Sequence, residues 1–244
     1  MPHEKRKSAP KHWPIQRKTN FFTFTARAGP HPREHCIPAG VLIRDVLGYA
    51  KNAKEIKYIL RRNYALVDGR PIKKPQFPLG HQDVISFPLL EKHYRLVYRP
   101  KHGLTPYEIS ADEATQKLCN IRNKTIVKGG KLQLNLHDGR NITLDDATFE
   151  GETIQTRGTV LIDLPTQEVK AYFPLNTEMY ALISHGRNMG VFGTILEISE
   201  TAGVTKSIAA IETPEGEIYR TTREYLFIVG KDKPILSLWK PKEA

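Results

Sequence analysis

The sequence predicts a multi-domain α+β protein whose positive charge is gathered in the first hundred residues. Its 244 residues are enough for two or three small domains, and the 39% apolar content can support real cores. Apolar side chains recur at helical spacing between residues 41 and 60. Alternating strand patterns and turn residues dominate after residue 92.

The net charge of +11 is unevenly distributed along the chain. Residues 1–100 hold 20 of the 37 Lys and Arg residues and 7 of the 26 Asp and Glu residues, so they carry +13 while residues 101–244 carry −2. This asymmetry points to nucleic acid or another anionic surface as a partner, although it says nothing about the fold. Because no stretch approaches 18 consecutive apolar residues and no apolar segment follows the basic start, we expect a cytoplasmic protein without membrane association.

Residues 1–36 are expected to form an extended basic N-terminal arm. They contain eight basic and two acidic residues, and five prolines disfavour a continuous helix. With little to bury, such an arm should become ordered only against a partner. Trp13, Phe21, Phe22 and Phe24 could attach the arm to the protein's own surface or stack on RNA bases, and both interpretations stay open.

Residues 37–91 are expected to begin with two short helices. Apolar stripes lie between Val41 and Leu47 and between Ile56 and Leu60, with a break at Gly48 to Asn52. The second helix has a basic face, since its cations recur at three- and four-residue steps: Lys51, Lys54, Lys57 and Arg61, with Arg62 and Arg44 as neighbours. Like charges at this spacing repel each other by a few tenths of a kcal/mol per pair, so a polyanion explains them better than local stability does.

Two strands should complete this unit. Tyr64 to Val67 leads into the tight-turn dipeptide Asp68-Gly69, and Asp83-Val-Ile-Ser-Phe87 reads as the returning strand. Three further cations follow the turn: Arg70, Lys73 and Lys74. The order of helix, basic helix, Asp-Gly-Arg turn and Asp-Val-Ile strand resembles the small RNA-binding domain shared by the bacterial ribosomal protein S4 and pseudouridine synthases. That domain occurs in proteins of quite different function.

Residues 92–175 are expected to form a central strand-rich domain with one helix. Alternating residues predict a strand near 94–99, a hairpin over 132–144 and another over 160–173. Ser110 to Glu113 is a capping box, and apolar residues then recur at helical spacing, so we expect a helix from about 111 to 122.

Residues 176–244 are expected to form a small β-barrel followed by a tail. After a strand at 180–183, three glycines follow at spacings of four and three residues: Gly186, Gly190 and Gly193. Glycine permits tight turns with positive φ and a close approach of neighbouring backbone. The pattern resembles the KOW motif of ribosomal proteins and transcription elongation factors, with Gly190 as its central glycine. Many KOW motifs have a basic residue directly before that glycine; Met189 stands there, so Arg187 is the candidate cation.

The order of these modules, behind a basic arm containing Ala9-Pro-Lys-His-Trp13, resembles the archaeal and eukaryotic small-subunit ribosomal protein family S4e. The resemblance covers nearly the whole chain, including Lys117-Leu-Cys119, His137-Asp138 and Phe227-Ile-Val-Gly230-Lys. It implies a structural protein that binds small-subunit ribosomal RNA beside neighbouring ribosomal proteins, without catalysis, cofactor or small-molecule substrate. The lack of the basic C-terminal extension of eukaryotic members favours an archaeal source.

The candidate RNA-binding residues follow from the charge pattern and from this resemblance. Lysine and arginine side chains would neutralise phosphates, and aromatic side chains would contact bases. The candidates are Lys5, Arg6, Lys7, Lys11, His12, Trp13, Arg17, Lys18, Arg44, Lys51, Lys54, Lys57, Arg61, Arg62, Arg70, Lys73, Lys74 and Arg187.

Catalytic and metal sites are not expected. His31, His35 and Cys36 are clustered, but a structural zinc site usually has four ligands in paired spacings. We interpret the two cysteines, Cys36 and Cys119, as reduced thiols. Asp145-Asp146 follows a hairpin strand, where solvated acids are ordinary.

Two rival functions stay open. One is an RNA-modifying enzyme that carries an S4-type RNA-binding module, although residues 92–175 offer neither the length nor a recognisable motif for a catalytic domain. The other is a transcription or translation factor that uses the KOW-type barrel to bind polymerase or ribosome transiently.

Overall fold

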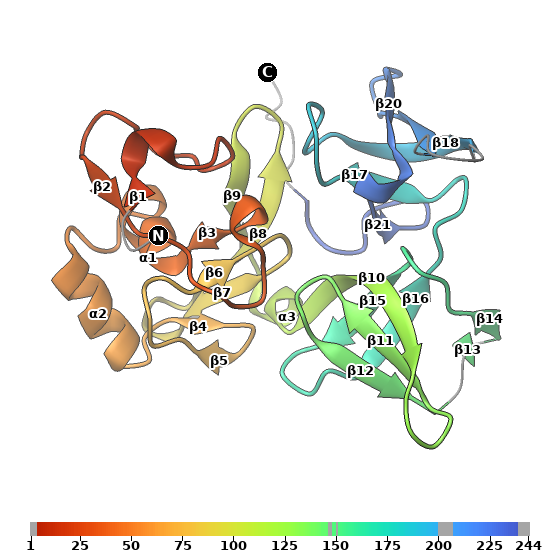
Figure 1. Ribbon diagram of the computed structural model, residues 1–244, viewed down its shortest axis with the longest axis horizontal. Helices are drawn as coiled ribbons and strands as arrows, with labels where there is room; N and C mark the ends of the chain where they lie inside the picture. The colour runs from red at the N-terminus through yellow and green to blue at the C-terminus, as the bar shows by residue number, and fades with distance from the viewer. Residues whose placement is uncertain (1–3, 146–147, 150, 200–206, 239–244) are drawn as a thin grey trace. The chain divides into compact units, whose positions relative to one another are not determined.

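The computed structural model describes residues 4–145, 148–149, 151–199 and 207–238, and strands dominate it (Figure 1). The strands form three five-stranded and three two-stranded sheets. By their contacts the residues divide into unit 1, residues 1–98 and 102–117, and unit 2, residues 99–101 and 118–244. The strand-rich α+β class is therefore confirmed, while domain boundaries near 36, 91 and 175 stay predictions. The helices in the described part of the chain lack the length and apolar character that a membrane span requires.

Unit 1 contains the two expected helices. The first is short: α1 (Ala39–Val41) continues directly into a π-helical turn, η3 (Leu42–Val46). The second, α2 (Ala53–Arg61), begins at Asn52, whose side-chain oxygen accepts the backbone N–H groups of Lys54 and Glu55 at 2.9 and 3.0 Å. Ile56 and Leu60 are fully buried, so the apolar stripe of α2 faces the core.

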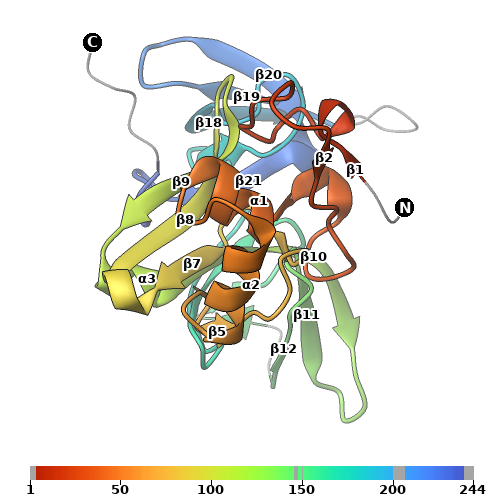
Figure 2. The same cartoon turned by 90° about the vertical axis from the view of Figure 1, so that its left-hand side faces the viewer.

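The main sheet of unit 1 has the strand order β5-β4-β7-β8-β9. Its strands are β4 (Leu66–Val67), β5 (Arg70–Pro71), β7 (Val84–Phe87), β8 (Lys92–Arg99) and β9 (Gly103–Ile109). The predicted Asp68-Gly69 turn is confirmed, since both residues have positive φ, +48° and +75°. Strand β8, predicted near 94–99 as part of the central segment, extends this sheet together with β9, which the sequence did not predict (Figure 2).

The N-terminal segment, residues 4–36, packs against the rest of unit 1, so the expectation of an arm with little to bury is wrong. It contains the paired strands β1 (Glu4–Lys5) and β2 (Phe22–Thr23) and the short helices η1 (Arg6–Ser8) and η2 (Arg33–His35). Trp13 is 2% exposed, and its indole N–H donates to the carbonyl oxygen of Cys36 at 2.7 Å. The prolines exclude a long helix, but they do not prevent the chain from burying an aromatic anchor.

A second strand pair of unit 1 begins directly after this segment. β3 (Ile37–Pro38) lies antiparallel to β6 (Pro78–Leu79). The backbone N–H of Leu104 also donates to the carbonyl of His12 at 2.9 Å, so the N-terminal segment contacts the start of β9.

The predicted helix from 111 to 122 is wrong beyond its first turn. Ser110 does cap a helix, accepting the Glu113 N–H at 3.3 Å, but α3 ends after Ala111–Ala114. The chain continues as an eleven-residue strand, β10 (Gln116–Ile126). Residues 117–121 are all buried, and such a continuous buried run fits a central strand as well as it fits one face of a helix. Pairing with strands on both sides decides for the strand.

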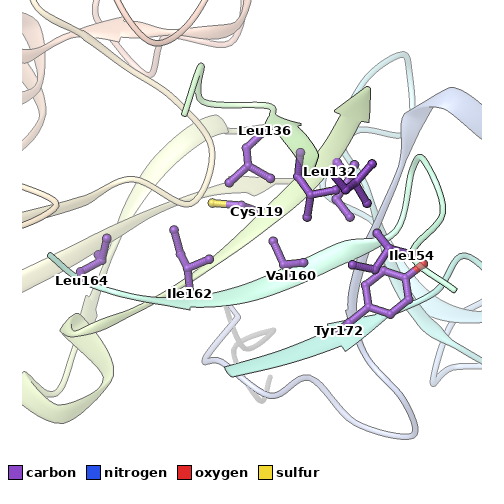
Figure 3. Close-up of a cluster of buried hydrophobic side chains, with 10 residues drawn as sticks. Cys119, Leu132, Leu136, Ile154, Val160, Ile162, Leu164 and Tyr172 are labelled. Carbon is purple, nitrogen blue, oxygen red and sulfur yellow. The ribbon is translucent and has the colours of Figure 1, made fainter. Parts of the chain in front are cut away.

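The first sheet of unit 2 has the order β12-β11-β10-β15-β16. Both predicted hairpins are confirmed: β11 (Leu132–Leu136) pairs with β12 (Asn141–Leu144), and β15 (Thr159–Asp163) pairs with β16 (Val169–Phe173). Short strands β13 (Thr148–Phe149) and β14 (Glu152–Thr153) form a separate pair. Figure 3 shows the apolar core that these strands enclose, including Cys119, Leu136, Val160, Ile162 and Tyr172.

The second sheet of unit 2 has the order β20-β19-β18-β17-β21. Its strands are β17 (Tyr180–Ile183), β18 (Phe192–Ser199), β19 (Ile208–Glu212), β20 (Ile218–Thr222) and β21 (Leu226–Gly230), and β17 is the strand predicted at 180–183. Buried aliphatic side chains of these strands pack together as a core, including Ile183, Ile195, Ile211 and Ile228.

Candidate nucleic-acid interface

The outer face of α2 presents exposed cations, as the sequence predicts. Lys54, Lys57 and Arg61 are exposed, while Ile56 and Leu60 on the opposite face are buried. No salt bridge joins these three cations to any acid among the described residues. Their charges are therefore available to a polyanion.

Tyr58 lies among these cations, and the sequence analysis missed it. Its side chain is 56% exposed, and the guanidinium carbon of Arg62 lies 5.7 Å from its ring centroid. The signal was present in the sequence, since Tyr58 follows Lys54 by four residues and therefore shares its face of the helix. An exposed aromatic ring between cations suits contact with a base or a ribose.

Further cations follow α2 along the chain. Lys51 and Arg62 flank the helix and are exposed, as are Arg70 on β5 and the neighbouring Lys73 and Lys74. Arg44 is different, because it binds both oxygens of Asp45 at 3.1 and 2.9 Å and lies over the ring of Phe24. Its guanidinium is thus already engaged within the protein, on a carboxylate that it shares with Arg6.

The N-terminal candidates divide into exposed and structural residues. Four lysines are exposed: Lys5, Lys7, Lys11 and Lys18. Arg6 and Trp13 are buried, and Arg6 pairs with Asp45 at 3.2 Å, so neither side chain is accessible to RNA in this conformation. Arg17 donates to the carbonyl oxygens of Ala9 and Pro10, at 2.6 and 2.8 Å.

The His12 side chain is also held within the protein. Its Nε2 lies 3.0 Å from the carbonyl oxygen of Cys36, and burial lowers the pKa of the His12 imidazole below its usual value. The ring is therefore a poorer source of positive charge than the exposed lysines around it.

The three glycines of the KOW-like segment have the backbone roles expected of them. Gly186 and Gly190 have positive φ, +88° and +92°. A Cβ atom at Gly190 would lie 2.6 Å from the backbone nitrogen of Pro100, and one at Gly193 would collide with the carbonyl oxygen of Glu212. Arg187 is exposed beside them.

One group of side chains could hold a metal among the described residues: Cys119, His137 and Asp138, whose ligand atoms lie within 4.8 Å of one another. All three groups already have protein partners, since the Cys119 thiol donates to Asp138. Asp138 pairs with Arg140 at 3.0 Å, and the backbone N–H of Asn120 donates to Nδ1 of His137 at 3.2 Å. The arrangement therefore suits a hydrogen-bonded turn better than an ion site.

The other candidates for chemistry are placed as follows. His31 pairs with buried Asp83 at 3.0 Å. Burial, with a smaller contribution from Asp83, raises the pKa of the Cys36 thiol to about 12, so that thiol is a weak nucleophile. Asp145 pairs with Lys131 at 2.6 Å, and Asp146 lies outside the described residues.

Comparison with known proteins places these features in a family. The family described as Ribosomal family S4e matches residues 90–169, and the RS4NT domain matches residues 2–34. The chain is 40% identical to the small ribosomal subunit protein eS4 of Ignicoccus hospitalis, over 98% of this chain and 96% of that protein. It is also 40% identical to eS4 of Methanocaldococcus jannaschii, over 97% of each chain.

A solved structure supports the same relation. The 30S ribosomal protein S4e of Thermoplasma acidophilum aligns with a TM-score of 0.67 at 25% identity, covering 81% of this chain and 96% of that one.

Proposed function

Because the chain belongs to the S4e family of small-ribosomal-subunit proteins, we propose that it is a structural constituent of that subunit and binds ribosomal RNA through the exposed cations of unit 1. The observation that carries this function is the 40% identity to an eS4 protein over 98% of the chain. The protein works in the cytoplasmic ribosome, supports translation and is not an enzyme.

The exposed cations of α2 support the RNA-binding part of the proposal. Each of Lys54, Lys57 and Arg61 can neutralise a phosphate and release condensed counterions, which favours association most at low salt. Tyr58 adds a ring that can contact a base or sugar where the RNA is unpaired. We therefore propose α2, together with Arg70, Lys73 and Lys74, as the main RNA contact of residues 37–117.

Unit 2 has a different proposed role. The second sheet has five strands and a positive-φ Gly190 under close backbone contact, which supports a KOW-type barrel. Unit 2 holds 17 Lys and Arg residues against 16 Asp and Glu residues, a net charge of +1, so it should bind RNA through fewer phosphates and should meet neighbouring ribosomal proteins.

The rival functions find less support. The relatives are ribosomal proteins, so an RNA-modifying enzyme is not favoured. A transient factor would dissociate from small subunits during a high-salt wash, whereas a structural constituent should sediment with them.

The test replaces the α2 cations in the full-length protein: Lys54→Ala, Lys57→Ala, Arg61→Ala and Arg62→Ala together. Affinity for transcribed archaeal small-subunit ribosomal RNA should fall about 10- to 100-fold near 0.1 M salt, because four phosphate contacts are lost. The slope of log affinity against log salt should become shallower by up to about 3.6, at roughly 0.7–0.9 for each of the four contacts. Filter binding across a salt series measures both quantities.

The matched control removes four exposed cations from unit 2: Lys128→Ala, Arg220→Ala, Lys231→Ala and Lys233→Ala. It lowers the net charge by the same four units as the α2 variant. If the position of the charge matters, this control should alter the affinity for ribosomal RNA much less. An α2 variant whose affinity and salt slope equal those of the wild type would remove α2 from the RNA contact.

A further inference from the structure

The N-terminal segment of unit 1 forms a basic hollow of about 450 Å³, which we call the arm hollow. It is lined by Lys5, Lys7, Arg17, Lys18, Thr19, Asn20 and Phe21. Four of these seven residues are cationic and none is acidic, so a bound anion would meet no opposing carboxylate in the lining. Its volume falls within the range of about 300–1,000 Å³ that is usual for pockets holding small organic ligands.

The hollow is formed before any partner binds. The backbone N–H of Arg6 donates to the carbonyl of Phe21 at 2.9 Å, and the Arg6 side chain donates to the carbonyl of Gln16. The guanidinium of Arg17 holds the carbonyls of Ala9 and Pro10. Two arginines therefore close the loop between β1 and β2 on itself. A loop fixed in this way loses little conformational entropy when it binds a ligand.

An exposed aromatic pair borders the same hollow. Phe21 is 66% exposed, and its ring centroid lies 4.6 Å from that of Phe22 in an edge-to-face arrangement. The ammonium group of Lys5 lies 5.5 Å from the Phe21 ring centroid. Exposed aromatic rings beside lysines are the combination that single-stranded nucleic-acid sites use, with rings for bases and cations for phosphates.

We propose that the arm hollow binds one unpaired nucleotide of RNA. The base stacks on Phe21, and the adjoining phosphate lies among the ammonium groups of Lys5, Lys7 and Lys18. The Asn20 amide supplies a donor and an acceptor for a base edge or a ribose hydroxyl. The inference rests on the proposed function, and it adds a site for single-stranded RNA that is separate from the phosphate contacts of α2.

The test uses the full-length protein and a fluorescein-labelled single-stranded octauridylate, with a labelled eight-base-pair RNA duplex for comparison. Phe21→Ala should weaken octauridylate binding about 5- to 100-fold in fluorescence anisotropy, which is the range expected from losing one stacked base. Binding of the duplex should change less than about twofold. Phe21→Trp should retain octauridylate binding, and the fluorescence of the new tryptophan should fall as the RNA is added.

Leu89→Ala provides the control, because Leu89 is an equally exposed apolar side chain of unit 1 outside the hollow. It should leave both affinities unchanged. Because Phe21 is exposed, its replacement should not unfold the protein, and circular dichroism checks this.

Three results would overturn the inference. Unchanged octauridylate affinity in Phe21→Ala would show that no base stacks on Phe21, and equal losses for single strand and duplex would reduce the hollow to a phosphate contact. A Phe21→Trp protein without quenching would exclude stacking. The proposed function fails separately, because it depends on binding of wild-type protein to small-subunit ribosomal RNA, which does not require octauridylate binding.

Discussion

Unit 1 buries several charged side chains, whereas the described residues of unit 2 bury one, Asp138, beside two cores of apolar side chains. In unit 1, Lys117 is 0% exposed, and its ammonium lies 2.7 Å from both Asp68 and Asp83. Asp83 also pairs with His31, and the buried guanidinium of Arg95 binds Glu113. The two core clusters of unit 2 are built from leucine, isoleucine and valine with a few small or aromatic residues.

The buried charges join segments that are distant in the sequence. His31 belongs to the N-terminal segment, and Asp83 precedes β7. Lys117 is the last residue of unit 1 and lies at the start of β10, whose later residues belong to unit 2. Strands β4 and β5 have two residues each, so they bury little apolar surface that could fix their positions. We infer that paired charges fix how the segments of unit 1 are arranged, whereas aliphatic packing fixes how the strands of unit 2 are arranged.

The surfaces differ in the same way. Unit 1 presents the arm hollow and the α2 cations, with no acid in the lining of the hollow. Unit 2 has a smaller hollow of about 190 Å³, lined by Pro100, Val191, Phe192, Thr213, Pro214, Glu215, Glu217 and Tyr219. Its two charged residues are both acidic, so it would repel a phosphate. Attraction for RNA should therefore be concentrated in unit 1.

The largest expected effect comes from breaking the charge cluster. Lys117→Met should lower the free energy of unfolding by about 3–5 kcal/mol, because Asp68 and Asp83 would remain buried without their shared cation. Urea denaturation followed by circular dichroism measures the change. Lys128→Met removes an exposed cation in unit 2 and should cost less than about 0.5 kcal/mol. A Lys117→Met loss below about 1 kcal/mol would mean that the buried charges do not hold unit 1 together.

This cluster also marks the limit of what the sequence could predict. Strands such as Tyr180–Ile183, the Asp68-Gly69 turn and the basic face of α2 follow from local patterns, and all three are confirmed. The burial of Lys117 has no local signal, because its partners lie 49 and 34 residues away.

The two corrected predictions have the same cause. The strand β10 forms by pairing with β11 and β15, and the N-terminal segment is ordered because Trp13 enters the core of unit 1. Both depend on contacts between distant residues, which periodicity cannot detect. At the candidate site, the lysines that charge singles out are exposed and stay predicted RNA contacts, but charge could not separate them from Arg6, which the fold encloses.

A smaller effect should appear as acid sensitivity of unit 1. Burial alone would raise the pKa of Asp83, but His31 and Lys117 outweigh it and hold the pKa well below its usual value. The unfolded state therefore takes up a proton below about pH 4, near the ordinary pKa of aspartate, while folded Asp83 stays ionised. The stability that Asp83 contributes is complete above that pH and is lost progressively as the pH falls further.

Urea midpoints measured from pH 6 to pH 3 check this direction. Asp83→Asn should be less stable than the wild type at pH 6, and the difference should narrow between pH 4 and pH 3. A difference that stays constant over this range would show that the ionisation of Asp83 does not stabilise the fold. A difference that widens toward pH 3 would reverse the assigned direction of the pKa shift.

The smallest effect should come from adding cations to unit 2. Glu215→Lys with Glu217→Lys changes the net charge by +4 at the acidic hollow, yet we expect the affinity for small-subunit ribosomal RNA to change by less than about threefold near 0.15 M salt. Exposed charges separated by more than about 8 Å are largely screened at that salt, so added cations help only where phosphates already lie close. The opposite change in unit 1, Lys54→Glu with Lys57→Glu, should weaken binding at least about tenfold, because it places two acids against phosphates. If the unit 2 variant gained affinity as strongly as the unit 1 variant lost it, RNA would lie along both units and the contrast between them would fail.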